Sequence, residues 1–279
     1  MKKITRRSFL AAAGLTAAAL ALTACGGSSS STASSTASSA AASSEAASSS
    51  AAAELTTVEA GKLTMATNAA FPPYEMTTDT GAFEGIDVDT AQAIAEKLGL
   101  ELQIDDMDFD AALLSVQQGK ADIVMAGVTV TDERKAVMDF SDSYATGIQS
   151  IIVPEGSDIA TPDDLAGKKI GTQRGTTGYI YCSDDFGDEN VVAYDDGLTA
   201  VQALNNGQVD AVVIDNAPAQ EFVAANPGLV ILDTSYAEED YAIGMAKGSS
   251  LEDAVNAALK ELKADGTLQS IVDKYITAE

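Results

Sequence analysis

The pattern of apolar and polar positions along this chain predicts that short buried strands alternate with amphipathic helices. Residues 123–126 are apolar without interruption and are bounded by turn residues, which suits a strand buried on both faces of a parallel sheet. In residues 88–98 apolar side chains recur at helical spacing and Gly99 follows, which predicts a helix with a glycine at its end. Similar faces recur in residues 251–262, after a possible capping box at Ser250 and Asp253, and in residues 268–275. This succession predicts an α/β protein.

One supersecondary unit occurs twice, 88 residues apart. Residues 116–127 and 204–215 both read as the end of a helix, a glycine turn and a buried strand. In this match Asp122 aligns with Asp210, and Gly127 aligns with Asp215. We therefore expect two lobes, each containing an open α/β sheet. Ligands of such sheets bind beyond the carboxyl ends of the strands.

The end of the first of these strands carries candidate binding chemistry. Thr129, Thr131 and two acidic residues follow Gly127 and predict a helix start, with Arg134 on its first turn. Exposed amides, hydroxyls and one guanidinium make a site for a small carboxylate. A surface ion pair is the alternative for Arg134. Beyond the first 24 residues, however, the chain has only one other arginine, Arg174, against 42 acidic residues.

The segment AGVTVTDERK, followed by DFSDSY, resembles the signature of the extracellular amino-acid-binding proteins of ABC importers. The resemblance covers residues 62–276. It implies a two-lobed type II periplasmic-binding-protein fold with two hinge crossings, near residues 144–149 and 238–242. Lobe I then comprises residues 58–145 and 242–279, and lobe II residues 146–241. It also implies a receptor that captures a free L-amino acid between the lobes and delivers it to a membrane permease, as a monomer and without a cofactor.

The resemblance also implies roles for individual residues. Arg134 is expected to bind the ligand's α-carboxylate and Asp215 its α-ammonium, although Asp215 could instead cap the helix start after it. Arg174 is expected at the rim. By themselves Phe71 and Phe109 fit a core as well as a pocket wall. The full set of expected ligand-binding residues is Asn68, Phe71, Phe109, Ala126, Gly127, Thr129, Arg134, Gln173, Thr176, Thr177 and Asp215.

Two of these residues bear on the ligand's side chain. Asn68 and Gln173 are uncharged amides, which suit a neutral polar side chain. The alternative is a basic amino acid, which requires another carboxylate, such as Glu75, to reach the pocket. The chain has no histidine, so we expect ligand affinity to be flat from about pH 6 to 8. An enzymatic alternative, a dehydratase of cyclic dicarboxylic acids on the same fold, lacks an evident proton donor.

Composition narrows the function further. The formal net charge is −26; without the first 24 residues, which carry four of the 16 basic groups, it is 12 − 42 = −30. No basic stripe exists to neutralise nucleic-acid phosphates. Beyond residue 25 there is a single cysteine, Cys182, so no internal disulfide can form. The absence of histidine makes a zinc site improbable, and we expect no metal.

The first 57 residues predict export and tethering. Residues 1–24 combine a basic start with a 16-residue apolar run and resemble a bacterial lipoprotein signal peptide, with Cys25 as the acylated residue. An ordinary signal peptide is the alternative, and an Arg-Arg pair leaves the export route, Sec or Tat, open. Residues 25–57 are almost entirely Ser, Ala, Thr and Gly and predict a flexible tether. The expected location is the outer face of a bacterial cell membrane.

Overall fold

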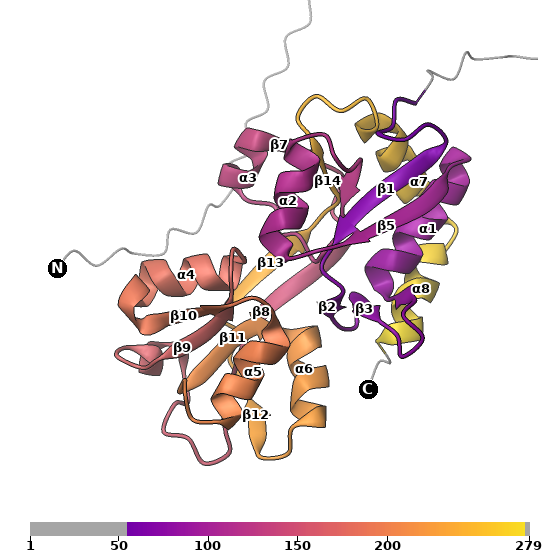
Figure 1. The fold of residues 1–279 in the computed structure, drawn as a ribbon. Coiled ribbons are helices and arrows are strands. Elements are labelled where there is room, and N and C mark those ends of the chain that lie inside the picture. Colours follow the sequence, from indigo (N-terminus) through magenta and orange to yellow (C-terminus); the bar gives the residue numbers. More distant parts are fainter. Residues whose placement is uncertain (1–54, 277–279) are drawn as a thin grey trace, which may run out of the picture. The chain divides into compact units, whose positions relative to one another are not determined.

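The computed structural model describes residues 55–276, so the predictions for the signal peptide, Cys25 and most of the tether lie outside the described residues. Two α/β sheets dominate this part of the chain (Figure 1). Four strands of the first sheet precede the second sheet in the amino-acid sequence, and one strand follows it. Its strands, in spatial order, are β5 (Glu101–Asp106), β1 (Lys62–Thr67), β6 (Ile123–Val124), β14 (Gly244–Ala246) and β7 (Met138–Phe140).

The second sheet is built entirely from the middle of the chain. Its strands, in spatial order, are β10 (Val191–Tyr194), β9 (Ile170–Gln173), β11 (Ala211–Asp215), β8 (Ala145–Pro154) and β12 (Leu229–Ile231), with β13 (Ala237–Tyr241) also pairing with β8. A small third sheet consists of β2 (Ala70–Phe71), β3 (Glu75–Thr77) and β4 (Phe83–Glu84).

Helices cover the two main sheets, as the alternating pattern predicts. Against the first sheet lie α1 (Ile86–Leu98), α2 (Phe109–Gln117), α3 (Asp132–Val137), α7 (Glu252–Ala264) and α8 (Thr267–Tyr275) (Figure 1). Against the second lie α4 (Thr177–Phe186), α5 (Gly197–Asn205) and α6 (Asn216–Ala225), with short 3₁₀ turns at Pro162–Leu165 and Asp188–Asn190. None of the helices in residues 55–276 is long and apolar enough to cross a membrane.

Most of the local predictions are confirmed. Helix α1 ends at Gly99, whose φ of 69° is the left-handed conformation that a glycine C-cap adopts. The apolar face of α7 is buried in the core of the first sheet. The capping box proposed for this helix is wrong, because α7 begins after Leu251 and has no side-chain cap. Ser249 instead accepts a hydrogen bond from the Leu251 amide through its side chain.

The internal repeat has a structural basis. In each copy the aspartate directly before the buried strand accepts a hydrogen bond from a backbone amide at or next to the neighbouring strand. Asp122 accepts a hydrogen bond from the amide of Thr64 in β1 at 2.8 Å, and Asp210 accepts one from the amide of Lys169, just before β9, at 2.7 Å. The paired strands are parallel in both copies: β1 runs parallel to β6, and β9 runs parallel to β11. The repeat therefore encodes the same parallel strand pair twice.

Strands β8 and β13 connect the two sheets. They pair antiparallel, with Ala145 opposite Tyr241 and Gln149 opposite Ala237. One strand leads from the first sheet into the second, and the other returns from it (Figure 1). This is the two-lobed α/β architecture with two hinge crossings that the resemblance implied.

Candidate functional site

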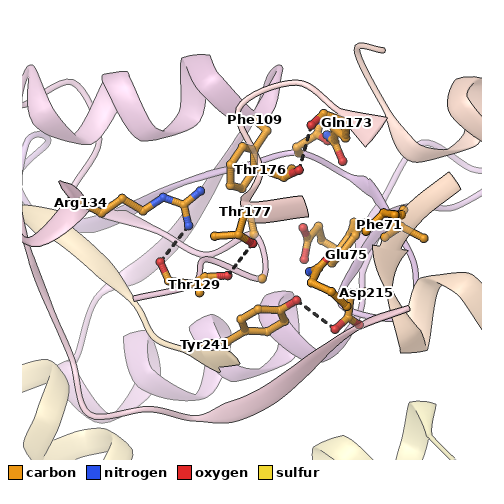
Figure 2. Close-up of a pocket in the computed structure, with 16 residues that line it drawn as sticks. Phe71, Glu75, Phe109, Thr129, Arg134, Gln173, Thr176, Thr177, Asp215 and Tyr241 are labelled. Atoms are coloured by element: carbon orange, nitrogen blue, oxygen red, sulfur yellow. Dashed lines mark hydrogen bonds between the residues drawn. The ribbon is translucent and has the colours of Figure 1, made fainter. Parts of the chain in front are cut away.

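A pocket lies where the carboxyl ends of the main parallel strands of both sheets meet (Figure 2). All eleven residues expected from the sequence line this one pocket. The wall also includes residues that were not on that list: Glu75, Gln149, Val213, Ile214 and Tyr241. Glu75 was considered only as an alternative, and Tyr241 lies in one of the predicted hinge crossings.

Arg134 is held in the pocket by the helix start that the sequence predicted. Thr131 caps α3, with its hydroxyl accepting a hydrogen bond from the Arg134 amide at 3.2 Å. The Arg134 side chain is 9% exposed, and its Nη1 donates to the Thr129 carbonyl oxygen at 2.8 Å. The guanidinium carbon lies 5.4 Å from the centre of the Phe109 ring. The predicted alternative of a surface ion pair is wrong, since Arg134 is buried and forms no ion pair within residues 55–276.

Three contacts join the two lobes across the pocket. Arg134 Nη2 donates to the Gly175 carbonyl oxygen at 3.2 Å. The hydroxyls of Thr129 and Thr177 lie 3.3 Å apart (Figure 2). On the opposite side Gln173 Nε2 donates to Asn68 Oδ1 at 2.9 Å. The pocket is thus enclosed by direct contacts between its two walls.

Arg174 is outside the pocket, as expected. Its side chain is 56% exposed and pairs with Asp195 at 3.1 Å on the surface of the second lobe. The neighbouring Gly175 has a φ of +75°, and the Asp110 carboxylate occupies the place that a Cβ would take. The glycine at this position allows the close approach of the two lobes.

Asp215 ends β11 with its carboxylate on the pocket wall, and it is 2% exposed. One oxygen accepts from the Ala217 amide at 3.0 Å and so caps α6, which is the structural role considered from the sequence. The other accepts from the Ile148 amide at 2.8 Å and from the Tyr241 hydroxyl at 3.0 Å. Burial raises the pKa of Asp215 to about 6. Capping therefore uses one oxygen, and the carboxylate has no ion-pair partner in the described part of the chain.

Glu75 and Asp87 add two more buried carboxyl groups on this side of the pocket, both 0% exposed. Burial raises the pKa of Glu75 well above its usual value and that of Asp87 to about 6. The sequence indicated no group that titrates near neutral pH. The structure corrects this, because burial moves these carboxyl groups and Asp215 toward that range.

Glu239 is a further functional candidate that sequence reasoning missed. It lies on β13, is 6% exposed, and accepts hydrogen bonds from the Thr129 hydroxyl at 3.1 Å and from Gln149 Nε2 at 2.9 Å. Both donors line the pocket. Glu239 therefore links a hinge strand to the walls of the site. In the sequence Glu239 is part of a short acidic run within the predicted crossing at residues 238–242, and nothing in that run indicated a contact with the pocket.

Two lobes that enclose a small polar pocket at their strand ends define a binding protein for a small charged solute. The chain belongs to the bacterial extracellular solute-binding proteins, family 3, whose model matches residues 63–278. It is 34% identical over 226 residues to the L-cystine-binding protein TcyJ of Escherichia coli strain K12, covering 79% of this chain and 85% of TcyJ. These findings confirm the resemblance and the expected function as an amino-acid-binding protein of an ABC importer.

Solved structures agree with this assignment. An ancestral arginine-binding protein bound to glutamine is 41% identical with a TM-score of 0.75, covering 78% of this chain and 99% of that protein. An ancestral arginine-binding protein bound to arginine is 42% identical with a TM-score of 0.74, covering 77% of this chain and 98% of that protein.

Proposed function

We propose that the pocket binds the main-chain groups of a free L-α-amino acid through Arg134 and Asp215. Arg134 uses two of its five N–H donors on protein carbonyls, which leaves three for a ligand carboxylate. A buried guanidinium without an ion pair is costly, and a carboxylate offsets that cost. The hydroxyls of Thr129, Thr176 and Thr177 are additional partners on the same wall.

Asp215 is the partner for the α-ammonium in this proposal. Its carboxylate is buried, is oriented by three hydrogen bonds and lines the same pocket as Arg134. An ammonium restores the opposite charge that this buried carboxylate lacks in the empty pocket. Two opposite charges at fixed positions select a zwitterion over a simple acid or amine.

For the ligand's side chain, we propose a cation of the arginine or lysine type. The expectation of a neutral polar side chain assumed that the amides of Asn68 and Gln173 are free to bind it. They are instead bonded to each other at 2.9 Å, and Asn68 Nδ2 also donates to the Met107 carbonyl oxygen at 3.0 Å. Glu75 differs from these amides, because both its carboxyl oxygens are buried and neither has a hydrogen-bond partner within residues 55–276.

This unpartnered Glu75 is the observation that carries the proposal. The two oxygens of Glu75 can accept more hydrogen bonds than the neighbouring Asp87 carboxyl group can donate, so a donor is still needed from the ligand that fills the pocket. Two of the similar solved structures are of arginine-binding proteins, which agrees with a cationic ligand. One of them is bound to glutamine, so the neutral amide is the alternative to be tested.

Calorimetry with arginine and citrulline tests the side-chain proposal. Citrulline has nearly the same shape as arginine but replaces the guanidinium with a neutral urea. We expect arginine to bind at least about 30-fold more tightly, which corresponds to about 2 kcal/mol for pairing a buried charge. Equal affinities, or tighter binding of glutamine than of arginine, contradict the cationic ligand and restore the neutral one.

For the whole chain, we propose a monomeric, non-catalytic receptor that is anchored by a lipid on Cys25 and tethered by residues 26–57. Residues 58–145 with 242–279 and residues 146–241 act as lobes that close about β8 and β13 and present the ligand to a permease. The Cys25→Ala variant tests the anchor. We expect it to move from the membrane fraction to the soluble exported fraction; retention on the membrane contradicts the anchor.

A further inference from the structure

Glu75 and Asp87 lie side by side although they come from different elements. Glu75 begins β3 and Asp87 lies in the first turn of α1. The Asp87 amide donates to the carbonyl oxygen of Tyr74, the residue next to Glu75, at 2.8 Å, and each of the two carboxyl groups acts on the pKa of the other. Asp87 Oδ2 accepts from the Gly127 amide at 3.0 Å and from the Tyr144 hydroxyl at 2.7 Å. In the part of the chain that the structure describes, no group donates a hydrogen bond to Asp87 Oδ1 or to either Glu75 oxygen. Three buried acceptor atoms are therefore left together.

A single proton resolves this arrangement. Two ionised carboxylates offer only acceptors and repel each other, whereas one protonated carboxyl group donates to the other. The surroundings favour the shared proton, because the ionisable groups acting on Glu75 from other elements are also acidic: Asp87, Asp106 and Asp215. The tyrosines on this side, Tyr74, Tyr144 and Tyr241, all have pKa values raised by burial and stay neutral. Neither carboxyl group forms an ion pair in residues 55–276.

We infer that Glu75 and Asp87 share one proton and act as a single unit of charge −1 that selects a cationic ligand side chain. The inference deepens the proposed function and rests on it. It also balances the charges of the filled pocket. Arg134 takes the α-carboxylate, Asp215 takes the α-ammonium, and the acid pair takes the side-chain cation. A neutral side chain leaves the charge of the pair buried without a partner.

The position of the proton makes a prediction that a lone Glu75 carboxylate does not. In Glu75→Gln the amide nitrogen can donate to Asp87 Oδ1 in place of the proton, and Asp87 keeps the charge. In Asp87→Asn the amide oxygen can still accept from Gly127 and Tyr144 while the amide nitrogen donates to Glu75, which then keeps the charge. Each single variant thus preserves one hydrogen bond and one negative charge. The double variant preserves the bond but has no charge.

The experiment measures the ratio of arginine to glutamine affinity by calorimetry at pH 7.5 in the unmodified protein, both single variants and the double variant. We expect each single variant to lower the ratio much less than the double variant, which should lower it at least about 30-fold, corresponding to the loss of one buried charge pair. A large loss in Glu75→Gln alone assigns the charge to Glu75 and overturns the shared pair. An unchanged ratio in the double variant also overturns it.

The unmodified protein supplies a second readout that does not depend on the variants folding. Adding the second proton neutralises the pair, so the affinity ratio should fall by up to tenfold per pH unit below about pH 6. The ratio removes the contribution of Asp215, because both ligands carry the same α-ammonium. A ratio that is constant from pH 7.5 to 5 overturns the shared proton. A protein that does not prefer arginine at pH 7.5 contradicts the proposed ligand instead.

Discussion

Replacing Arg134 with alanine tests the centre of the site most directly. The guanidinium has three free N–H donors, and a bidentate contact with the ligand carboxylate uses two of them. Hydrogen bonds to charged groups contribute about 1.5–3 kcal/mol each. Part of this is offset, since the variant also removes a buried cation that is unpaired in the empty pocket. We therefore expect a loss of at least about 2–3 kcal/mol of ligand affinity, roughly 30- to 150-fold.

Calorimetry measures this loss, and Arg174→Ala is the matched control. Arg174 is exposed and, among residues 55–276, pairs only with Asp195, so its removal should change affinity by less than about threefold. Thermal unfolding of the ligand-free Arg134→Ala variant separates a binding defect from a folding defect. We expect its melting temperature to stay within a few degrees of the unmodified protein, because the lost contacts and the lost desolvation cost oppose each other. Affinity within threefold of the unmodified protein, or a larger loss in Arg174→Ala, refutes the assignment of Arg134.

Three further predictions concern the other wall of the pocket. The des-amino analogue of the ligand should bind at least about tenfold more weakly, because it leaves the Asp215 carboxylate without a partner. Competition calorimetry measures this difference in affinity, and equal affinity of the two compounds contradicts the role of Asp215. Asp87 and Asp215 bind protons more tightly in the folded than in the unfolded protein, and so does Glu75, whose pKa is raised well above its usual value. From pH 7 to 5 the two aspartates alone should raise the free energy of unfolding of the ligand-free protein by roughly 2–3 kcal/mol, and Glu75 adds to this rise, as denaturant titration can show; a fall over that range contradicts the raised pKa values. Gly147→Ala should destabilise the protein by about 1–3 kcal/mol and weaken ligand binding, because a Cβ at this position overlaps the ring of Tyr241, whose hydroxyl donates to Asp215. Unchanged stability and unchanged affinity argue against this packing.

Sequence patterns carried much of the architecture because they report local and periodic properties. The apolar spacing in α1 and α7 predicted two helices and their buried faces, and the repeated turn, aspartate and strand predicted two lobes that each contain an open α/β sheet. Strand ends followed by threonine, arginine or aspartate marked the binding edge of both sheets. Since parallel strands point their carboxyl ends to the same edge, residues far apart in sequence could be assigned to one pocket.

The chemistry of the side-chain end of the pocket depends on contacts that no sequence spacing encodes. Whether Asn68 is free or bonded depends on how closely Gln173 of the other lobe approaches it. Whether Glu75 is charged depends on its burial and on Asp87, which belongs to another element. Desolvation and pairing act through space, so only the tertiary structure decides them. The sequence therefore predicted the two lobes and, through its family resemblance, eleven of the residues that line the pocket. The packing of those lobes added the remaining lining residues and decided which polar groups remain available to a ligand.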